Sequence, residues 1–159
     1  MTLIHRYIRA EEGVAAVEFA FVAVPVLWLL LGIAELAVVY HLQSLVILAA
    51  DEGARRGKTG RAYGFDSPEA AVRAKIQEVM KPWFGEEDPN FTVTCYSGFD
   101  VYDGTSAHPG STCNGDQIGL YTVTYTWHAK TPILMDVFGE DGEVPIVARA
   151  LVKNERWIQ

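Results

Sequence analysis

Residues 13–40, GVAAVEFAFVAVPVLWLLLGIAELAVVY, decide what kind of protein this chain is. Their apolar part, residues 14–39, is 26 residues long, and a helix needs about 20 residues to cross the hydrocarbon of a bilayer. The run is too long for the apolar region of an ordinary secretory signal, and no small-residue cleavage site follows it. We therefore expect a retained transmembrane helix over residues 14–40, preceded by a short polar leader, residues 1–13.

Two glutamates interrupt the apolar run, Glu18 near its start and Glu35 near its end. Lipid strongly penalises an unpaired carboxylate, so each needs an explanation. Glu18 either reaches water at the edge of the membrane or pairs with a positive charge. Glu35 lies near the outer boundary if the span begins at Phe19, where it either reaches water or contacts a partner protein.

Beyond the membrane the same helix is expected to continue to about Arg56. Apolar and small side chains recur there at helical spacing beside a polar face, and they are Leu42, Leu45, Val46, Ala49, Ala50, Gly53 and Ala54. The first half of the helix would then be an anchor and the second half a packing spine. Three glycines in residues 57–64, GKTGRAYG, are expected to end it.

The rest of the chain predicts a small α+β domain over residues 41–159, which begins with the spine. A second helix starts at Ser67-Pro68-Glu69 and ends at Pro82, with an apolar face of Val72, Ile76, Val79 and Trp83. Apolar and polar residues alternate over residues 91–96, 121–127 and 146–153, which predicts three strands. A short helical turn is expected over residues 131–138. The predicted architecture is a helix packed on a small antiparallel sheet.

Charge and cysteines limit the function. The net charge of −7 at pH 7 and the pI near 5.0 argue against a nucleic-acid partner. Basic residues on both sides of the span leave its orientation undecided by charge. Cys95 and Cys113 both follow the span, 18 positions apart. We predict that they form a disulfide, which is favoured in an oxidising compartment and stabilises by roughly 3 kcal/mol in the chain-entropy model.

Gly13, Glu18 and Phe19 have the spacing of a type IV-like prepilin processing site, especially that of the Flp branch. The string AAVEFAFVAVPVLWLLLGIAEL, residues 15–36, resembles the start of TadE-like pseudopilins, minor subunits of the tight adherence (Tad) pilus. Two later features are similar to the C-terminal half of this family: Thr-Pro at 131–132 and Lys-Asn-Glu at 153–155. Arg156 stands where the resemblance leads us to expect proline.

The resemblance implies a pilin-like lollipop with a cytoplasmic N-terminus and a periplasmic C-terminal domain in the inner membrane. A dedicated prepilin peptidase would cut between Gly13 and Val14. The subunit would help to initiate or cap the pilus with other minor pilins, the major pilin and the inner-membrane assembly platform. Whether it enters the surface pilus or stays at the base is open.

Processing would give Glu18 a partner. The new amine on Val14 is mostly charged at neutral pH, and pairing it with Glu18 would spare an apolar filament one unpaired cation and one unpaired anion. The pair forms between subunits or within one chain, and the sequence does not separate these. Pro25 removes the hydrogen bond to the carbonyl of Phe21. This either permits a bend during packing or is merely tolerated in a membrane helix. The expected assembly residues are Glu18, Phe19, Pro25 and Glu35.

Other chemistry finds little support in the sequence. Residues 53–59, GARRGKT, have three residues between the glycines where the phosphate-binding loop requires four. The histidines lack metal-ligand spacing, and Asp100, Asp103 and Asp116 lack the calcium-loop pattern. We expect no metal, no cofactor and no enzyme. The alternative function is a single-span inner-membrane protein whose periplasmic domain binds a ligand or senses the envelope. Such a domain should contain a deep pocket with converging polar groups.

Overall fold

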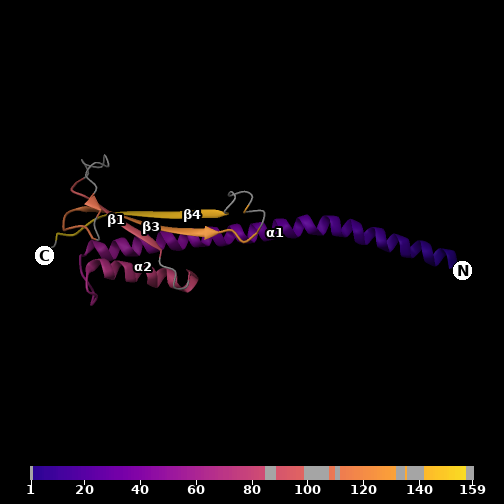
Figure 1. Cartoon of the computed structure of the whole chain (residues 1–159), viewed down its shortest axis with the longest axis horizontal. Helices are drawn as coiled ribbons and strands as arrows, with labels where there is room; N and C mark the ends of the chain where they lie inside the picture. Colours follow the sequence, from indigo (N-terminus) through magenta and orange to yellow (C-terminus); the bar gives the residue numbers. More distant parts are fainter. Residues whose placement is uncertain are drawn as a thin grey trace. The chain divides into compact units, whose positions relative to one another are not determined.

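The computed structural model describes residues 2–84, 89–98, 108–109, 112–131, 135 and 142–156. In chain order its elements are α1 (Thr2–Lys58), α2 (Pro68–Phe84), β1 (Asn90–Tyr96), β2 (His108–Pro109), β3 (Ile118–His128) and β4 (Glu143–Lys153), as Figure 1 shows. The predicted α+β class is confirmed: a long apolar N-terminal helix is followed by a second helix and an antiparallel sheet.

The chain forms two compact units. One contains Met1–Val38 and His128–Glu143, and the other contains Val39–Trp127 and Val144–Gln159. Helix α1 contributes its first part to one unit and its remainder to the other.

Helix α1 is longer than the expected helix from Val14 to Arg56, because it begins at Thr2 and ends at Lys58. Residues 2–12 contain no glycine or proline, and the isolated Gly13 lowers helix stability by only about 1 kcal/mol. At the other end, basic side chains in the last turn suit the negative end of the helix dipole. Gly60 follows with φ of 61°, a conformation that glycine adopts readily, and its N–H donates to the Gly57 carbonyl (3.1 Å).

Helix α2 starts as predicted, because the Ser67 hydroxyl accepts a hydrogen bond from the Ala70 N–H (3.1 Å). Its predicted end at Pro82 is wrong, since the helix continues to Phe84. Proline in the last turn removes a single hydrogen bond, and the continuation buries Phe84 against the ring of Tyr125 (ring centroids 4.1 Å apart). The predicted apolar face is also wrong at one position: Trp83 is 60% exposed, and the buried residues are Ala71, Val72, Ile76, Met80 and Phe84.

The sheet has the strand order β2-β1-β3-β4. β1 and β3 are antiparallel, with Val93 opposite Tyr121 and Cys95 opposite Gly119. Three of the strands were predicted, although β3 begins earlier than expected, at Ile118, and β4 begins at Glu143. The two-residue β2 was not predicted. Of the expected turn over 131–138, the described residues show the hydrogen bond from the Met135 N–H to the Thr131 carbonyl (3.1 Å); the other residues lie outside the described part.

One hydrophobic core joins the later part of α1, helix α2 and the sheet. In Figure 1, α2 lies beside this part of α1. The predicted spine stripe is largely confirmed: it is buried except for Leu45, which is partly exposed. The largest fully buried side chains are Tyr121, Ile76, Met80, Val46, Val72 and Val123. Alternation along β4 is as predicted, with Ile146, Ala148 and Ala150 inside.

Candidate functional site

Within the part of the chain that the structure describes, the first part of α1 has a mostly uncovered surface. Between residues 13 and 38, Gly32 and Glu35 alone are buried. Exposed apolar side chains surround the helix, and Val14 (59% exposed) and Phe19 (74%) are among them. The helix over Gly13–Lys58 is long and apolar enough to cross a membrane, which fits a single-pass membrane protein. An exposed surface of this composition suits lipid or neighbouring helices.

The predicted processing and assembly residues lie on this uncovered surface. Gly13, Val14, Glu18, Phe19 and Pro25 are all exposed. The helix is continuous through Pro25. The structure thus leaves these five residues accessible, and their roles in processing and assembly stay predictions.

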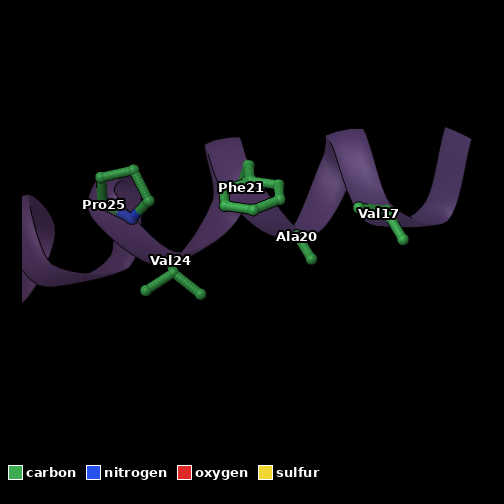
Figure 2. Close-up of a pocket in the computed structure, with 5 residues that line it drawn as sticks. All are labelled: Val17, Ala20, Phe21, Val24 and Pro25. Carbon is green, nitrogen blue, oxygen red and sulfur yellow. The ribbon is translucent and has the colours of Figure 1, made fainter. Parts of the chain in front are cut away.

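A shallow apolar hollow lies on the same surface, between Val17 and Pro25. Figure 2 shows the rings of Phe21 and Pro25 on the same side of the helix, separated along its axis, with the short side chain of Ala20 between Val17 and Val24. All five lining side chains are apolar. The hollow therefore suits an apolar side chain of a neighbour and lacks the polar groups that would orient a substrate or cofactor.

Glu35 has a partner within its own unit. Its carboxylate accepts hydrogen bonds from the backbone N–H groups of Lys130 and Thr131, the latter at 2.9 Å. The residue is 7% exposed. The sequence left open whether this carboxylate reaches water or contacts a partner protein. In the structure it is instead hydrogen-bonded to residues of its own chain. Its predicted role in assembly stays a prediction.

The GARRGKT segment is the end of α1 and the following turn, and its glycines serve packing. A methyl group on Gly53 would lie 2.9 Å from a side-chain carbon of Ile76 in α2. One on Gly57 would lie 2.0 Å from the hydroxyl of Tyr121 in β3. Because real side-chain contacts are wider than this, each glycine allows α1 to approach a neighbouring element closely. The helical position of the segment agrees with the rejection of a phosphate loop.

Tyr121 is fully buried at that contact. Its hydroxyl has no hydrogen-bond partner within the part of the chain that the structure describes. Burial raises the pKa of Tyr121 to about 12, because the phenolate would lose its hydration. A phenol that stays protonated and lies inside a core has no access to a substrate, so we assign it a packing role.

Cys95 and Cys113 form the predicted disulfide, with Cα atoms 5.4 Å apart. Asn154, which is 2% exposed, binds the backbone next to this disulfide. Its side-chain amide donates to the carbonyls of Cys113 (2.7 Å) and Asn114 (3.3 Å). The next residue, Glu155, donates its N–H to the Lys58 carbonyl at the end of α1 (3.0 Å). The Lys-Asn-Glu segment thus links the disulfide, the C-terminal strand and the spine helix.

Of the three aspartates that the sequence analysis compared with a calcium-binding loop, Asp116 is the one that the structure describes. Its carboxylate accepts a hydrogen bond from Arg156 Nε (2.7 Å) and lies 3.7 Å from Lys153 Nζ. The hydrogen bond from Arg156 holds the pKa of Asp116 below its usual value. Asp100 and Asp103 lie outside the described residues. Among the residues that are described, no group of three or more His, Cys, Asp or Glu side chains is placed to hold a metal.

The family comparison agrees with the resemblance seen in the sequence. The model of the family "TadE-like protein" matches residues 13–55. Over these residues the chain is similar to that family. The resemblance is confirmed over this range and supports a TadE-like protein of the Tad pilus system. No curated protein and no solved structure matches the chain.

The TadE-like segment contains the uncovered helix surface and most of the spine. It begins at Gly13 and ends at Arg55, so it includes Glu18, Pro25 and Glu35. The family is structural and associated with pili. The Lys-Asn-Glu segment lies outside the match, and its likeness to the family stays a prediction.

Sequence reasoning missed two features of this chain. The hydrogen bonds of Glu35 join residues about 95 positions apart, and only an unexplained acid in an apolar run hinted at them. The close contact of Gly57 with Tyr121 was also missed. The sequence feature that could have predicted this contact is the four-residue spacing of Gly53 and Gly57, which places both glycines on one helix face and indicates close packing.

Proposed function

We propose that this TadE-like protein is a minor pseudopilin that takes part in the assembly of a Tad/Flp-type pilus. The observation that carries the proposal is the exposed apolar surface of α1 within a segment that matches the TadE-like family from Gly13 onward. A helix with this surface needs lipid before assembly and neighbouring helices after it. Initiation, the tip and the base are the positions that a minor subunit would take in the pilus.

We infer that residues 1–13 are a leader and that a prepilin peptidase removes it on the cytoplasmic side. Gly13 has no side chain, so a narrow protease groove can admit it, and it is exposed next to Val14. Glu18 is exposed one helical turn beyond Val14, where its carboxylate can meet a new N-terminal amine. The domain after residue 40 would then lie in the periplasm, an oxidising compartment that suits the Cys95–Cys113 disulfide.

Cleavage is tested by measuring the N-terminal mass of the protein from cells with and without the peptidase. We expect a chain that begins at Val14 when the peptidase is present. Gly13→Leu should remain uncut yet inserted in the membrane. Ala20→Leu is the control, because it places the same side chain on the same exposed surface away from the cleavage position, and it should be cut normally. A wild-type chain that keeps residues 1–13 beside an active peptidase would contradict the proposal.

The alternative, a sensor or ligand-binding domain, needs a deep pocket with converging polar groups. The hollow on α1 has an apolar lining and lies on an exposed helix, so it does not support this function.

A further inference from the structure

The two residues Lys130 and Thr131 are joined to the anchor helix at a defined height. Glu35 of α1 accepts hydrogen bonds from the N–H groups of Lys130 and Thr131, which directly follow β3. The positive charge of Lys130 also interacts with the Glu35 carboxylate. All of these residues belong to one compact unit. The height of Glu35 along the helix therefore sets the height of Lys130 and Thr131.

The sequence places Glu35 near the outer end of the apolar span. Glu18 and Glu35 are separated by 16 residues without a charged side chain. At about 1.5 Å per residue, the two carboxylates are roughly 25 Å apart along the helix axis. The hydrocarbon of a bilayer is about 30 Å thick. If Glu18 marks the inner edge, Glu35 lies at the outer edge of the hydrocarbon.

The hydrogen bonds suit that position. A carboxylate in lipid is costly unless it is paired, and so is a backbone N–H without an acceptor. Glu35 pairs with two such N–H groups at once, so each side removes the penalty of the other. In water these three residues would not need this contact, because water would hydrate the Glu35 carboxylate and the two N–H groups.

The described residue that follows Thr131, Met135, has an apolar side chain, and its N–H donates to the Thr131 carbonyl (3.1 Å). Met135 is 41% exposed, although it packs against Gly142, where a methyl group would lie 3.0 Å from its Cγ. The Gly142 carbonyl in turn accepts a hydrogen bond from the Ala129 N–H (2.9 Å).

We infer that Met135 makes a second membrane contact, in which its side chain faces the acyl chains of the outer leaflet beside the anchor helix. This inference rests on the proposed anchoring of α1. Its partner is the lipid that already surrounds the exposed α1 side chains in the same unit, such as Leu31 (56% exposed). Glu35 is the residue that positions Met135, because it binds the N–H of Thr131, whose carbonyl accepts the N–H of Met135.

The test uses the full-length protein in vesicles of phosphatidylethanolamine and phosphatidylglycerol, some of which carry nitroxide groups on their acyl chains. Both native cysteines are in the disulfide, so Met135→Cys supplies a single thiol for a polarity-sensitive fluorophore. Val147→Cys on β4 is the control, because Val147 is similarly exposed (46%) and belongs to the other unit. Flotation of the vesicles measures anchoring separately.

We expect the label at 135 to emit at shorter wavelength and to be quenched by the nitroxide lipids at least about twofold more than the label at 147. Adding Glu35→Ala to Met135→Cys should lower the quenching toward the control, while the protein still floats with the vesicles.

Equal quenching at 135 and 147 in a protein that floats would overturn the lipid contact and leave the anchor intact. If the label at 135 is shielded from water but not quenched by the nitroxide lipids, the lipid contact is overturned, and residue 135 contacts a protein surface instead. A protein that does not float would overturn the anchor, and the lipid contact with it.

Discussion

Gly57 of α1 and Tyr121 of β3 touch so closely that residue 57 has no room for a side chain. A methyl group there would lie 2.0 Å from the Tyr121 hydroxyl oxygen and 2.5 Å from the ring carbon that bears it. Both residues are buried. This contact sets how near the spine helix lies to the sheet.

We predict that Gly57→Ala destabilises the C-terminal domain by about 1–2 kcal/mol. Alanine favours a helix over glycine by about 1 kcal/mol, but overpacking a rigid core position commonly costs more than that. Denaturant unfolding of the full chain in detergent, with the disulfide intact, measures the difference. Gly98→Ala is the control, because none of the residues that the structure describes lies within 4 Å of the added methyl group. A Gly57→Ala protein as stable as the wild type would show that the helix can move away freely.

Tyr121→Phe should leave the domain as stable at pH 7 or increase its stability by about 1 kcal/mol. The hydroxyl is buried with no hydrogen-bond partner among the described residues, so the substitution removes an unpaired polar group. Thermal unfolding of the two proteins measures the effect. Tyr40→Phe is the control at an exposed position (70%) and should change stability little. A loss of several kcal/mol in Tyr121→Phe would reveal a partner for the hydroxyl.

The wild type should also lose stability at high pH through Tyr121. Its pKa is about 12 when folded and near 10 when unfolded. Between these values the unfolded chain releases a proton that the folded chain keeps, so rising pH favours unfolding. The contribution is fully present below pH 10 and falls by about 2–3 kcal/mol as the pH rises toward 12. The stability difference between the wild type and Tyr121→Phe, followed from pH 8 to 11.5, should shift in favour of phenylalanine above pH 10. A constant difference would contradict the raised pKa.

Asn154→Ala should destabilise the domain by about 1–3 kcal/mol, because it leaves the carbonyls of Cys113 and Asn114 without their amide donor. Asn154→Asp should be at least as harmful, since it keeps the shape but offers an acceptor where a donor is needed. Asn90→Ala at an exposed position is the control. Chemical unfolding measures all three. Equal stability of the two Asn154 variants and the control would rule out the role we assign to this side chain.

Glu18→Ala should insert and be cleaved normally but lose association with the other pilins and reduce the number of surface pili. If Glu18 pairs with the Val14 amine of a neighbour, its removal leaves a cation in an apolar interface, and breaking one side of a buried pair typically costs about 3–5 kcal/mol. Glu18→Gln should rescue poorly, because it keeps the shape without the charge. Co-purification with the major and minor pilins, together with pilus counts, measures the effect. Wild-type assembly by a processed Glu18→Ala protein would reduce Glu18 to an acid at the membrane edge.

Local patterns predicted most elements of this fold correctly. The Ser67 cap, the alternation along β4 and the stripe from Leu42 to Ala54 each depend on neighbours in the sequence. Errors occurred where a distant contact competed with a local rule. Helix α2 passes Pro82 because Phe84 packs on Tyr125, and Trp83 stays exposed beside His41 because Met80 and Phe84 occupy the core.

The sequence by itself determined that this chain has a helix able to span a membrane, a TadE-like start and a disulfide, because apolar length, motif spacing and cysteine number are properties of the chain alone. Only the tertiary structure decided what Glu35, Gly57 and Asn154 do. Each acts through a hydrogen bond or a packing contact with residues 40 or more positions away. Such contacts follow from how helices and strands pack, and no local periodicity encodes them.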